Sequence, residues 1–529
     1  MGDEPQNGSV GGSPRSPAGT AVCLSALGIT KRFPGVLAND DITFHLRDRQ
    51  IHALLGENGS GKTTLCKVLT GLYRPDGGTL ALYGKPTVFR SPHQAYEAGV
   101  FMVQQHFSLV ERLTVTENVV LGLDRSRTER GRAKTTKAVE EVGERYNLRV
   151  KPSAFIWQLS VGERQRVEIL KALYRGAKIL ILDEPTTVLS PQECDQLFEN
   201  LQHLAANGTS VIFISHKLHE VLSVCEEVTV LRKGRTVASV DPRGSDMTPA
   251  ELAKLMVGRA INLSVKTTPP PDRSAPLALE VTGVTCNDEF GRAVIDDLSL
   301  SIKEGEIVGL AGVAGNGQRE FAEAITGMRN LAKGTVTVRG HQLKNGSSQD
   351  AIQAGIAYVP EDRFGTGLVS SLNMQDNLIL KSYRGSGMSR LSFLDYKAAR
   401  ANADALIESF DIRGKPDTLV RQLSGGNAQK VILARELSSA PNVMVVAAPT
   451  RGLDVSAMET VRELLLRAAQ SKVGVLLISE DLDEVMQLSD RIAVMFKGSI
   501  IGSVDGKDAN RNEIGLMMAG VKEASLAAS

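Results

Sequence analysis

The feature that most constrains this chain of 529 residues is an internal repeat, in which two halves carry the same motifs in the same order. Gly56 matches Gly312, and Gly84 matches Gly340, both with a shift of 256 residues. Further along, QLSVGERQRVEILKAL at 158 matches QLSGGNAQKVILAREL at 422, with a shift of 264. Eight extra residues therefore lie in the second half, between the regions of 361 and 422. Such a repeat predicts two similar folded units in tandem.

The repeat also sets the expected domain boundaries. The Pro-rich, polar segment TTPPPDRSAP separates the halves, as a linker would. The first residues are rich in Gly, Pro and Ser and lack an apolar segment, which is typical of a disordered leader rather than of a signal peptide. We expect a leader at 1–21, a first domain at 22–260, a linker at 261–276, a second domain at 277–521 and a tail at 522–529.

Composition excludes several classes of protein. Apolar residues make up 42% of the chain and charged residues 23%, which is ordinary for a soluble globular protein. The net charge of +1 and the absence of long Lys/Arg runs give no sign of nucleic-acid binding. The five cysteines are scattered, so we expect buried thiols in a reducing compartment. No apolar run approaches the length of about 18 residues that indicates a membrane span.

Within each half, short β-branched runs alternate with helical patterns. In the first half IHALLG runs into GKTTLCKVLTGL, and KILILDEP precedes a helix and then SVIFISH. The order strand, loop, helix, strand predicts an α/β fold with a parallel sheet and a ligand at the carboxyl ends of its strands.

The segment GENGSGKT at 56–63 fits the pattern GxxxxGK[ST] and lies between an apolar strand and a helix. Its glycines allow backbone N–H groups to converge on phosphate oxygens at the start of the helix. Lys62 is expected to reach the β- and γ-phosphates, and the Thr63 hydroxyl to ligate Mg²⁺. The predicted nucleotide contacts of this loop are Gly56, Glu57, Asn58, Gly59, Ser60, Gly61, Lys62, Thr63 and Thr64.

Two acidic residues follow the apolar run ILIL. Asp183 ends the strand, where its carboxylate suits a direct or indirect partner of Mg²⁺. Glu184 is the expected base that orients or deprotonates the water attacking the γ-phosphate. An isolated Asp-Glu pair is commonly a solvated strand end, but the upstream phosphate loop favours the catalytic interpretation. His216, after the strand VIFIS, is a further candidate for contact with the γ-phosphate, although a lone histidine is usually structural.

The phosphate loop, Gln105 after an apolar strand, LSVGE at 159–163, the Asp-Glu pair and a strand-ending His together resemble an ATP-binding cassette (ABC) nucleotide-binding domain. The resemblance covers 22–260 and 277–521, and it implies ATP and Mg²⁺ as cofactors. It implies in each domain a RecA-like parallel-sheet core, an antiparallel β part and a helical subdomain that carries the signature. It gives Gln105 a place in catalysis and among the metal ligands, and it places Phe33 against adenine. The alternative for Phe33 is an ordinary loop or core aromatic.

The second half has lost the charged groups of this site and kept others. Because the second half lacks both carboxylates, no acidic side chain there would hold the metal ion or position the attacking water. We therefore expect no useful turnover in that half. The glycines Gly312, Gly315 and Gly317 remain, so the amide cradle is predicted to keep its shape. At the positions of Lys62, Thr63, Asp183, Glu184 and His216 the second half carries, in that order, Gln318, Arg319, Ala447, Ala448 and Glu480.

ABC domains work as head-to-tail pairs, in which each ATP lies between the phosphate loop of one domain and the signature of the other. Carried onto this chain, the resemblance completes the first half's site with Ser424, Gly425 and Gly426 of LSGGN and with Asp454 of RGLD. The substituted residues of the second half fall together in the other composite site, which also contains LSVGE and Ser190. The expected result is one competent and one degenerate composite site.

The motif sequences of both halves resemble those of the tandem ATPases of bacterial importers for simple sugars and nucleosides. ERQRVEILKALYRGA and AAPTRGLD favour the nucleoside branch, which is linked to basic membrane lipoproteins, because sugar importers usually keep DEPTRG in the second half. The implied partners are two polytopic permease subunits and an extracytoplasmic solute-binding protein, with this chain peripheral on the cytoplasmic face of the inner (plasma) membrane. Gln105 and Glu361, at matched positions, are where the family couples to its membrane subunits.

Two other functions remain open. A soluble tandem ABC ATPase acting on ribosomes or nucleic acid would commonly keep both catalytic sites and carry a long charged linker or metal-binding insertions. Here one site is dismantled and the linker is short and Pro-rich, and no nucleic acid is expected as a partner. A module that only senses ATP is opposed by the complete set of Lys62, Asp183 and Glu184.

Overall fold

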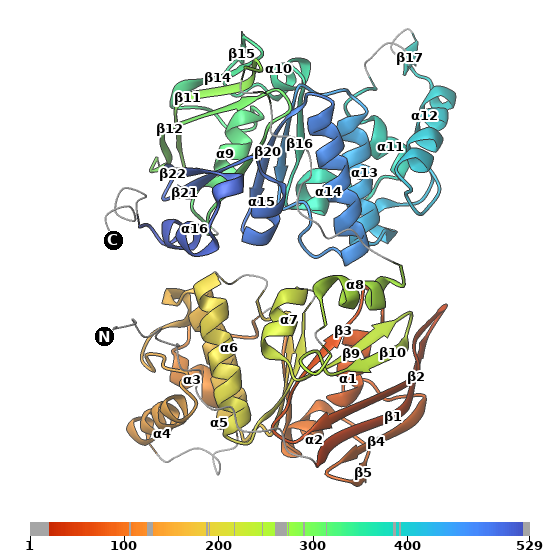
Figure 1. Ribbon diagram of the computed structural model, residues 1–529, viewed down its shortest axis with the longest axis vertical. Coiled ribbons are helices and arrows are strands. Elements are labelled where there is room, and N and C mark those ends of the chain that lie inside the picture. The colour runs from red at the N-terminus through yellow and green to blue at the C-terminus, as the bar shows by residue number, and fades with distance from the viewer. Residues whose placement is uncertain are drawn as a thin grey trace, which may run out of the picture. The chain divides into compact units, whose positions relative to one another are not determined.

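The computed structural model describes residues 21–104, 107–123, 131–186, 189, 191–215, 217–245, 247–259, 272, 274–288, 291–313, 315–383, 388–390 and 393–521. The chain divides into two compact units, Met1–Ile261 and Asn262–Ser529 (Figure 1). Among the described residues, no helix combines the length and the apolar character that crossing a membrane requires. All five cysteines are buried, as the sequence predicts.

The first unit contains two sheets. The antiparallel sheet has the strand order β2-β1-β4-β5, and the second sheet has the order β10-β9-β3-β8-β7-β6, in which only β9 and β10 are antiparallel. The strands are β1 (Val22–Phe33), β2 (Val36–Arg47), β3 (Ile51–Leu55), β4 (Gly77–Leu82), β5 (Lys85–Thr87), β6 (Val100–Val103), β7 (Ile179–Asp183), β8 (Ser210–Ile214), β9 (Glu227–Arg232) and β10 (Arg235–Val240).

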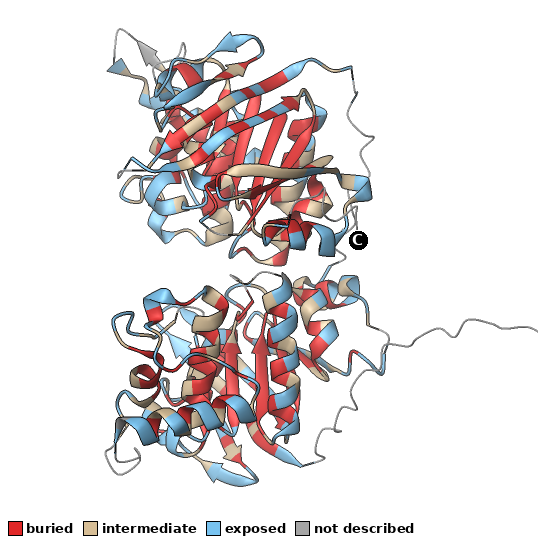
Figure 2. Cartoon of the chain, turned by 90° about the vertical axis from the view of Figure 1, so that its left-hand side faces the viewer, coloured by how far each residue is buried: buried red, intermediate tan, exposed pale blue. Residues whose placement is uncertain are grey.

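Helices cover the parallel sheet, and this explains why its central strands are buried along their whole length. Figure 2 shows the buried strands between helices. Helices α3, α4 and α5 pack against one another as a helical part. The helices are α1 (Lys62–Leu69), α2 (Pro92–Glu97), α3 (Val115–Val120), α4 (Arg132–Arg145), α5 (Val161–Tyr174), α6 (Pro191–Ala206), α7 (Leu218–Val224) and α8 (Pro249–Val257).

The second unit repeats this topology, with sheets ordered β12-β11-β14-β15 and β16-β19-β20-β13-β21-β22. The first is antiparallel, and in the second only β21 and β22 are antiparallel. The main strands are β11 (Leu277–Asn287), β12 (Ala293–Lys303), β13 (Ile307–Ala311), β14 (Lys333–Val338), β15 (His341–Gln342), β16 (Ile356–Val359), β19 (Val443–Ala447), β20 (Gly474–Ser479), β21 (Arg491–Phe496) and β22 (Ser499–Asp505).

The helices of the second unit follow the same order along the chain. A small hairpin of β17 (Ser389–Arg390) and β18 (Phe393–Leu394) precedes α12. The helices are α9 (Gln318–Ile325), α10 (Ser348–Gln353), α11 (Met374–Ile379), α12 (Tyr396–Ser409), α13 (Gly425–Leu437), α14 (Val455–Gln470), α15 (Leu482–Leu488) and α16 (Arg511–Met518).

The structure locates the eight extra residues of the second half. The shift between matched elements grows from 256 at β3 and β13 to 259 at α3 and α11 (374 minus 115), so three residues enter after β16. It grows to 264 at α4 and α12 (396 minus 132), so five more enter before α12, where the hairpin lies. Both insertions fall between the strand β16 and the signature helix α13.

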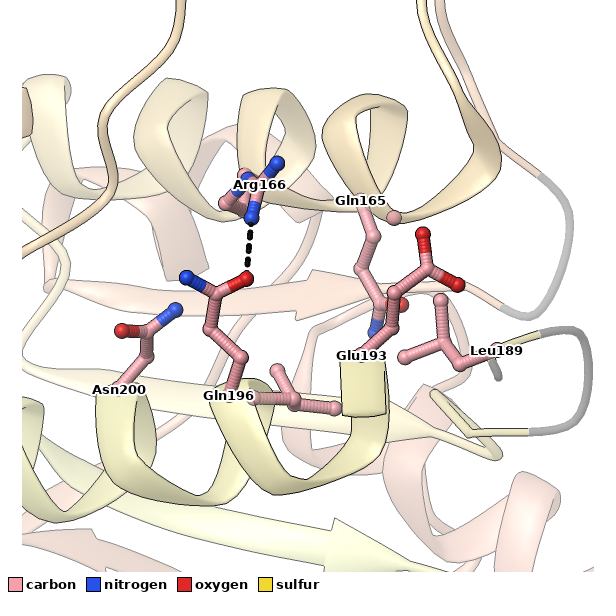
Figure 3. Close-up of a pocket in the computed structure, with 8 residues that line it drawn as sticks. Gln165, Arg166, Leu189, Glu193, Gln196 and Asn200 are labelled. Carbon is pink, nitrogen blue, oxygen red and sulfur yellow. Dashed lines mark hydrogen bonds between the residues drawn. The ribbon is translucent and has the colours of Figure 1, made fainter. Parts of the chain in front are cut away.

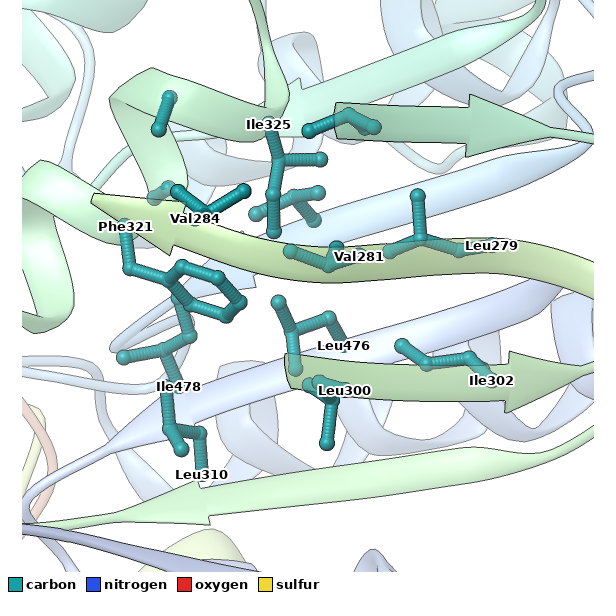
Figure 4. Close-up of a cluster of buried hydrophobic side chains, with 14 of the residues drawn as sticks. Leu279, Val281, Val284, Leu300, Ile302, Leu310, Phe321, Ile325, Leu476 and Ile478 are labelled. Atoms are coloured by element: carbon teal, nitrogen blue, oxygen red, sulfur yellow. The ribbon is translucent and has the colours of Figure 1, made fainter. Parts of the chain in front are cut away.

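The core of the second unit shows how its layers are held together. Phe321 on α9 is fully buried and lies against Leu310 of β13 and Ile478 of β20, and residues of the antiparallel sheet such as Val284 close the cluster (Figure 4). The helix that follows the phosphate-loop position is thereby anchored between the two sheets. Burial of a large aromatic side chain stabilises a fold by about 2–3 kcal/mol.

Candidate nucleotide-binding site

The phosphate-binding loop of the first half joins β3 to α1, as the sequence predicts. Lys62 begins the helix, and its Nζ donates to the carbonyl oxygens of Gly56 at 2.5 Å and Glu57 at 3.0 Å. The side chain is buried and curls back over its own loop. A cation held at the start of a helix, beside backbone N–H groups, is the arrangement that attracts a phosphate.

Two glycines of this loop are required by space as well as by conformation. Gly56 has φ 151° and Gly61 has φ 102°, both outside the range that side chains favour. A Cβ on Gly61 would lie 2.5 Å from the carbonyl oxygen of Ala38, and a Cβ on Gly56 would meet the backbone of Leu231. Gly59, with φ 79°, has open space around it, so there the requirement is conformational. Only glycine fits the cradle at the two crowded positions.

Asp183 and Glu184 lie at the carboxyl end of β7. Burial raises the pKa of Asp183, and the neighbouring Glu184 adds to that rise, while Lys62 opposes it. A half-buried carboxylate that is penalised when ionised is stabilised by a bound cation, so its chemistry fits Mg²⁺. Thr63, exposed on the first turn of α1, is the predicted hydroxyl ligand. Among the described residues no group of three or more His, Cys, Asp or Glu could hold a metal by itself.

The backbone of Glu184 is in the left-handed region, with φ 47°. Its amide donates to the carbonyl oxygen of Ile214 at 2.9 Å, which holds the turn after β7 to the neighbouring strand β8. A glutamate in this conformation is strained by about 1–3 kcal/mol, and strain of this kind concentrates at functional sites. The fold thus fixes the direction in which this carboxylate leaves the strand.

A partly buried carboxylate, Glu220, that our sequence analysis missed joins the ends of two strands. The hydroxyls of Thr186 and Ser215 donate to Oε2 of Glu220 on α7, at 2.7 and 3.1 Å. Lys217 lies 3.5 Å from the other oxygen of Glu220. The signal was available, because the second half carries Thr450, Ser479 and Glu484 at the same spacing.

Phe33 lies at the end of β1. Its ring packs edge-on against Tyr73 with 5.4 Å between centroids, and its exposed fraction is 36%. Lys31 Nζ lies 5.8 Å from the centre of the same ring. One part of the ring is therefore packed and another part faces solvent. Contact with adenine stays a prediction.

In the matching loop of the second half, which the structure describes except at 314, two features of the first loop recur although its charge is lost. Gln318 begins α9, and its Nε2 donates to the carbonyl oxygen of Val313 at 3.0 Å. This is the position of the bond from Lys62 to Glu57. Gly317 has φ 104°, close to its counterpart in the first half. A neutral amide therefore replaces the lysine as the partner of the loop carbonyl.

The neighbouring Arg319 points its charge elsewhere. Its Nε donates to Glu323 one helical turn along α9, at 2.8 Å, and its side chain is 76% exposed. Glu323 is also paired with Arg329 at 2.7 Å. An arginine neither ligates Mg²⁺ nor, in this ion pair, turns toward the loop.

Ala447 and Ala448 end β19 without either carboxylate. Ala448 nevertheless has φ 43°, and its amide donates to the carbonyl oxygen of Ile478 at 2.7 Å. The turn is the same as that at Glu184. The second half therefore has the strained backbone conformation without the carboxylate that this conformation presents in the first half.

The signature residues of the second half have visible structural roles. Ser424 caps α13, and Asn427 returns a bond of 3.0 Å from its Nδ2 to the Ser424 hydroxyl. A Cβ on Gly426 would lie 3.0 Å from the Cβ of Ala457, so these two helices approach closely. Asp454 caps α14 by accepting a bond of 2.8 Å from the amide of Ala457. Contact of these residues with ATP, and of Gly425 with them, stays a prediction.

In the second half the positions of Gln105 and His216 carry carboxylates. Glu361 forms an ion pair with Arg451, which lies in the loop between β19 and α14. Burial raises the pKa of Glu480, and the charge of Arg451 opposes that rise. Arg451 therefore pairs with Glu361, and its charge also acts on Glu480.

Three predicted residues, Gln105, Ser190 and His216, lie outside the described residues. A shallow pocket between α5 and α6 of the first unit contains none of the predicted catalytic residues (Figure 3). There Arg166 on α5 donates to Oε1 of Gln196 on α6 at 2.7 Å. This pocket borders the first half's own signature helix.

Comparison with known proteins adds to this geometry. The ABC transporter family profile matches residues 39–187 and 295–451. The chain is 44% identical to the glucose import ATP-binding protein TsgD13 of Haloferax volcanii, over 94% of this chain and 96% of that protein. It is also 44% identical to the guanosine import ATP-binding protein NupO of Bacillus subtilis, over 94% of this chain and 97% of that protein.

Among solved structures, the archaeal ribosome recycling factor aABCE1, in complex with the ribosomal stalk protein aP1, matches with a TM-score of 0.59. The match covers 90% of each chain at 19% identity, which is a likeness of fold alone.

Proposed function

The chain belongs to the ABC transporter family of ATP-binding proteins, and we propose that it is the ATP-hydrolysing subunit of an importer for nucleosides or simple sugars. ATP binding and ATP hydrolysis follow from the family. The observation that carries the finer proposal is the asymmetry of the two loops: Lys62 is buried over the first, and Gln318 takes its place in the second. We infer that each chain has one competent site.

The competent site hydrolyses ATP by positioning and charge. Lys62 neutralises the β- and γ-phosphates, and the amides of the loop at 56–63 hold their oxygens. Thr63 and Asp183, together with Gln105, would hold Mg²⁺, which supplies positive charge to the phosphates when bound. Glu184 orients the attacking water and accepts its proton as the bond from oxygen to the γ-phosphorus forms and the bond to ADP breaks.

The head-to-tail pairing of ABC domains places the second half in this proposal. Ser424, Gly425, Gly426 and Asp454 complete the site that Lys62 begins. Closure on ATP then drives the membrane partners between two access states, and hydrolysis releases the closed state. In this account the second half contributes a surface and no chemistry.

The proposed partners are membrane permease subunits and an extracytoplasmic solute-binding protein, with the chain peripheral on the cytoplasmic face of the membrane. The similarity to import ATP-binding proteins over nearly the whole chain supports this assignment. Relatives for glucose and for guanosine are equally similar, so the nucleoside branch rests on AAPTRGLD and ERQRVEILKALYRGA. A role on ribosomes has only a likeness of fold behind it.

The test uses the chain assembled with its membrane subunits. Glu184→Gln keeps the size and the backbone of the residue and removes the base. We expect ATP binding to remain and kcat to fall about 10²–10⁴-fold. Measured together, nucleotide binding and phosphate release separate loss of the base from loss of the fold. Turnover near the wild-type rate would contradict the assignment of Glu184.

A further inference from the structure

One arginine of the second half connects three segments that surround the signature. Arg363 follows β16 and opens a π-helical turn. Its Nε donates to Oε1 of Gln429 on α13 at 2.7 Å, and its Nη2 donates to the carbonyl oxygen of Arg451. A Cβ on Gly425 would lie 3.2 Å from its Nη1. This side chain therefore contacts the signature helix and the loop that carries Asp454.

A second arginine closes the same arrangement. Arg451 pairs through its guanidinium with Glu361, which lies two residues before Arg363 on the same loop. The loop after β16 is thus bonded twice to the loop after β19: side chain to side chain, and side chain to backbone. We call Arg363, Arg451, Glu361 and Gln429 the arginine clamp.

The sequence of the first half lacks both arginines. The repeat places Phe107 and Thr187 at the positions of the two arginines. Gln165 on α5 is the counterpart of Gln429, and its buried Oε1 has no hydrogen-bond partner among the described residues. Figure 3 shows Gln165 pointing from α5 toward the pocket, beside Glu193. The acceptor is present in both halves, and the arginine that uses it is present in one.

The clamp replaces a connection that the second half has lost. In the first half the positions of the clamp's Glu361 and of Glu480 carry Gln105 and His216, the residues predicted to contact a nucleotide. The second half has lost the lysine and the two acids, which are replaced by Gln318, Ala447 and Ala448. A nucleotide there would therefore lack the contacts that would hold the positions of Glu361 and Glu480 together. The ion pair and the bonds of Arg363 lie within the protein itself, so they form without a nucleotide.

We propose that the arginine clamp is a positioning device, which holds α13 and the Asp454 loop in one arrangement without a nucleotide in the second half. The signature at 424–426 is then ordered before ATP binds. Contact between it and the ATP of the first half therefore costs less free energy of ordering. This role rests on the proposed function, in which that signature completes the first half's site. Arg363 and Arg451 touch no reacting atom.

The first experiment measures order directly, in the full chain without nucleotide. Arg363→Met keeps the length of the side chain and removes every donor. We expect the amides of α13 that donate within the helix, from Ala428 onward, to exchange hydrogen about tenfold faster or more, because a local opening no longer breaks the bonds of Arg363. The amides of α5, measured in the same sample, are the internal control and should not change. Gln165→Met, the counterpart of a change at Gln429, should leave the exchange of α13 unchanged.

The second experiment measures turnover in the chain assembled with its membrane subunits. Glu361→Arg and Arg451→Glu each place like charges together, and we expect each to lower kcat about tenfold or more, since displaced groups cost rate steeply. The KM for ATP should stay within about twofold, because Lys62 and its loop are untouched. The double variant, with the charges exchanged, should recover most of the kcat.

The outcomes separate the clamp from the function on which it rests. Faster hydrogen exchange of α13 with an unchanged kcat would support the clamp. The same result would contradict the proposal that the signature of the second half completes the site of the first half. Unchanged exchange of α13 in Arg363→Met would overturn the clamp, whatever the rate. A double variant as slow as the single variants would also overturn it, since the ion pair would then have no part in positioning.

Discussion

At the scale of single residues, the two halves share backbone conformations and differ in the side chains that would carry out the chemistry. Glu184 and Ala448 adopt the same left-handed conformation and bond to matching carbonyls, yet only the glutamate carries a carboxylate. Gln318 keeps the bond to the loop carbonyl that Lys62 makes, and it gives up the charge. Matching backbone bonds therefore recur in both halves, whereas the side chains on which the proposed activity depends differ between them.

A prediction at this scale concerns Gln318. Gln318→Ala removes one neutral hydrogen bond, worth about 1 kcal/mol to the loop, and no charge. We expect kcat/KM for ATP to stay within about threefold of the wild-type value. Lys62→Ala is the matched change in the first half, and it should lower the same quantity by about 10²-fold or more. Comparable losses in steady-state assays of the two variants would mean that both sites turn over.

At the scale of elements, each half joins two strand ends to a helix through a carboxylate, but the surroundings differ. In the first half Lys217 lies beside Glu220 on α7. In the second half the repeat puts Asp481 at the lysine's place, and Oε1 of Glu484 on α15 has no hydrogen-bond partner among the described residues. Burial raises the pKa of Glu484, and Asp481 adds to the rise, while the hydroxyls of Ser479 and Thr450 oppose it.

The pH dependence follows from the sign of this shift. A carboxyl whose pKa is higher in the folded than in the unfolded state contributes stability at low pH, and that stability is lost as pH rises through the folded value. Glu484→Gln is always neutral. Its melting temperature minus that of the wild type should therefore become more positive from about pH 5 to about pH 8. A difference that does not vary with pH would contradict this.

Glu220→Gln is the control for that experiment. It removes a carboxylate that Lys217 compensates, so breaking the pair should destabilise the first unit most where both groups are charged. We therefore expect the melting temperature of Glu220→Gln to lie below that of the wild type.

At the scale of the whole molecule, two units of the same topology carry different sets of charged residues. Both units have the same strand order and a glycine-rich turn, and only the first has the lysine and the acids. The chain should therefore complete one hydrolytic cycle at a time, although both halves carry a glycine-rich loop at the matching position.

Trapping with orthovanadate tests this directly, because it captures the ADP that a site has just produced. We expect a single ADP per chain, recovered on peptides of the first unit after photolabelling. Glu184→Gln, which forms ADP too slowly, should retain none under the same conditions. Recovery of label from 312–319 would show that the second loop also completes hydrolysis.

By itself the sequence determined the repeat, the α/β class, the phosphate loop and the loss of its charges in the second half. These depend on local periodicity and on the spacing of motifs, which survive in one dimension. The helical and antiparallel parts came from the resemblance, and the structure confirms the fold. The predicted roles of Gln105 and His216 were drawn from sequence alone and stay predictions.

Only the tertiary structure decided which side chains meet. Arg363 and Gln429 are 66 residues apart, and nothing in the local pattern of either predicts their bond. The same holds for Arg451 with Glu361. The carboxylate that joins Thr186 to Ser215 differs, because the matching Thr450, Ser479 and Glu484 of the second half were a signal for it. Contacts of this kind depend on the register of the strands and the packing of helices on them, because these bring distant loops to one edge of a sheet. The loop after β16 places Arg363 beside the signature helix, and the matching position of the first half carries Phe107.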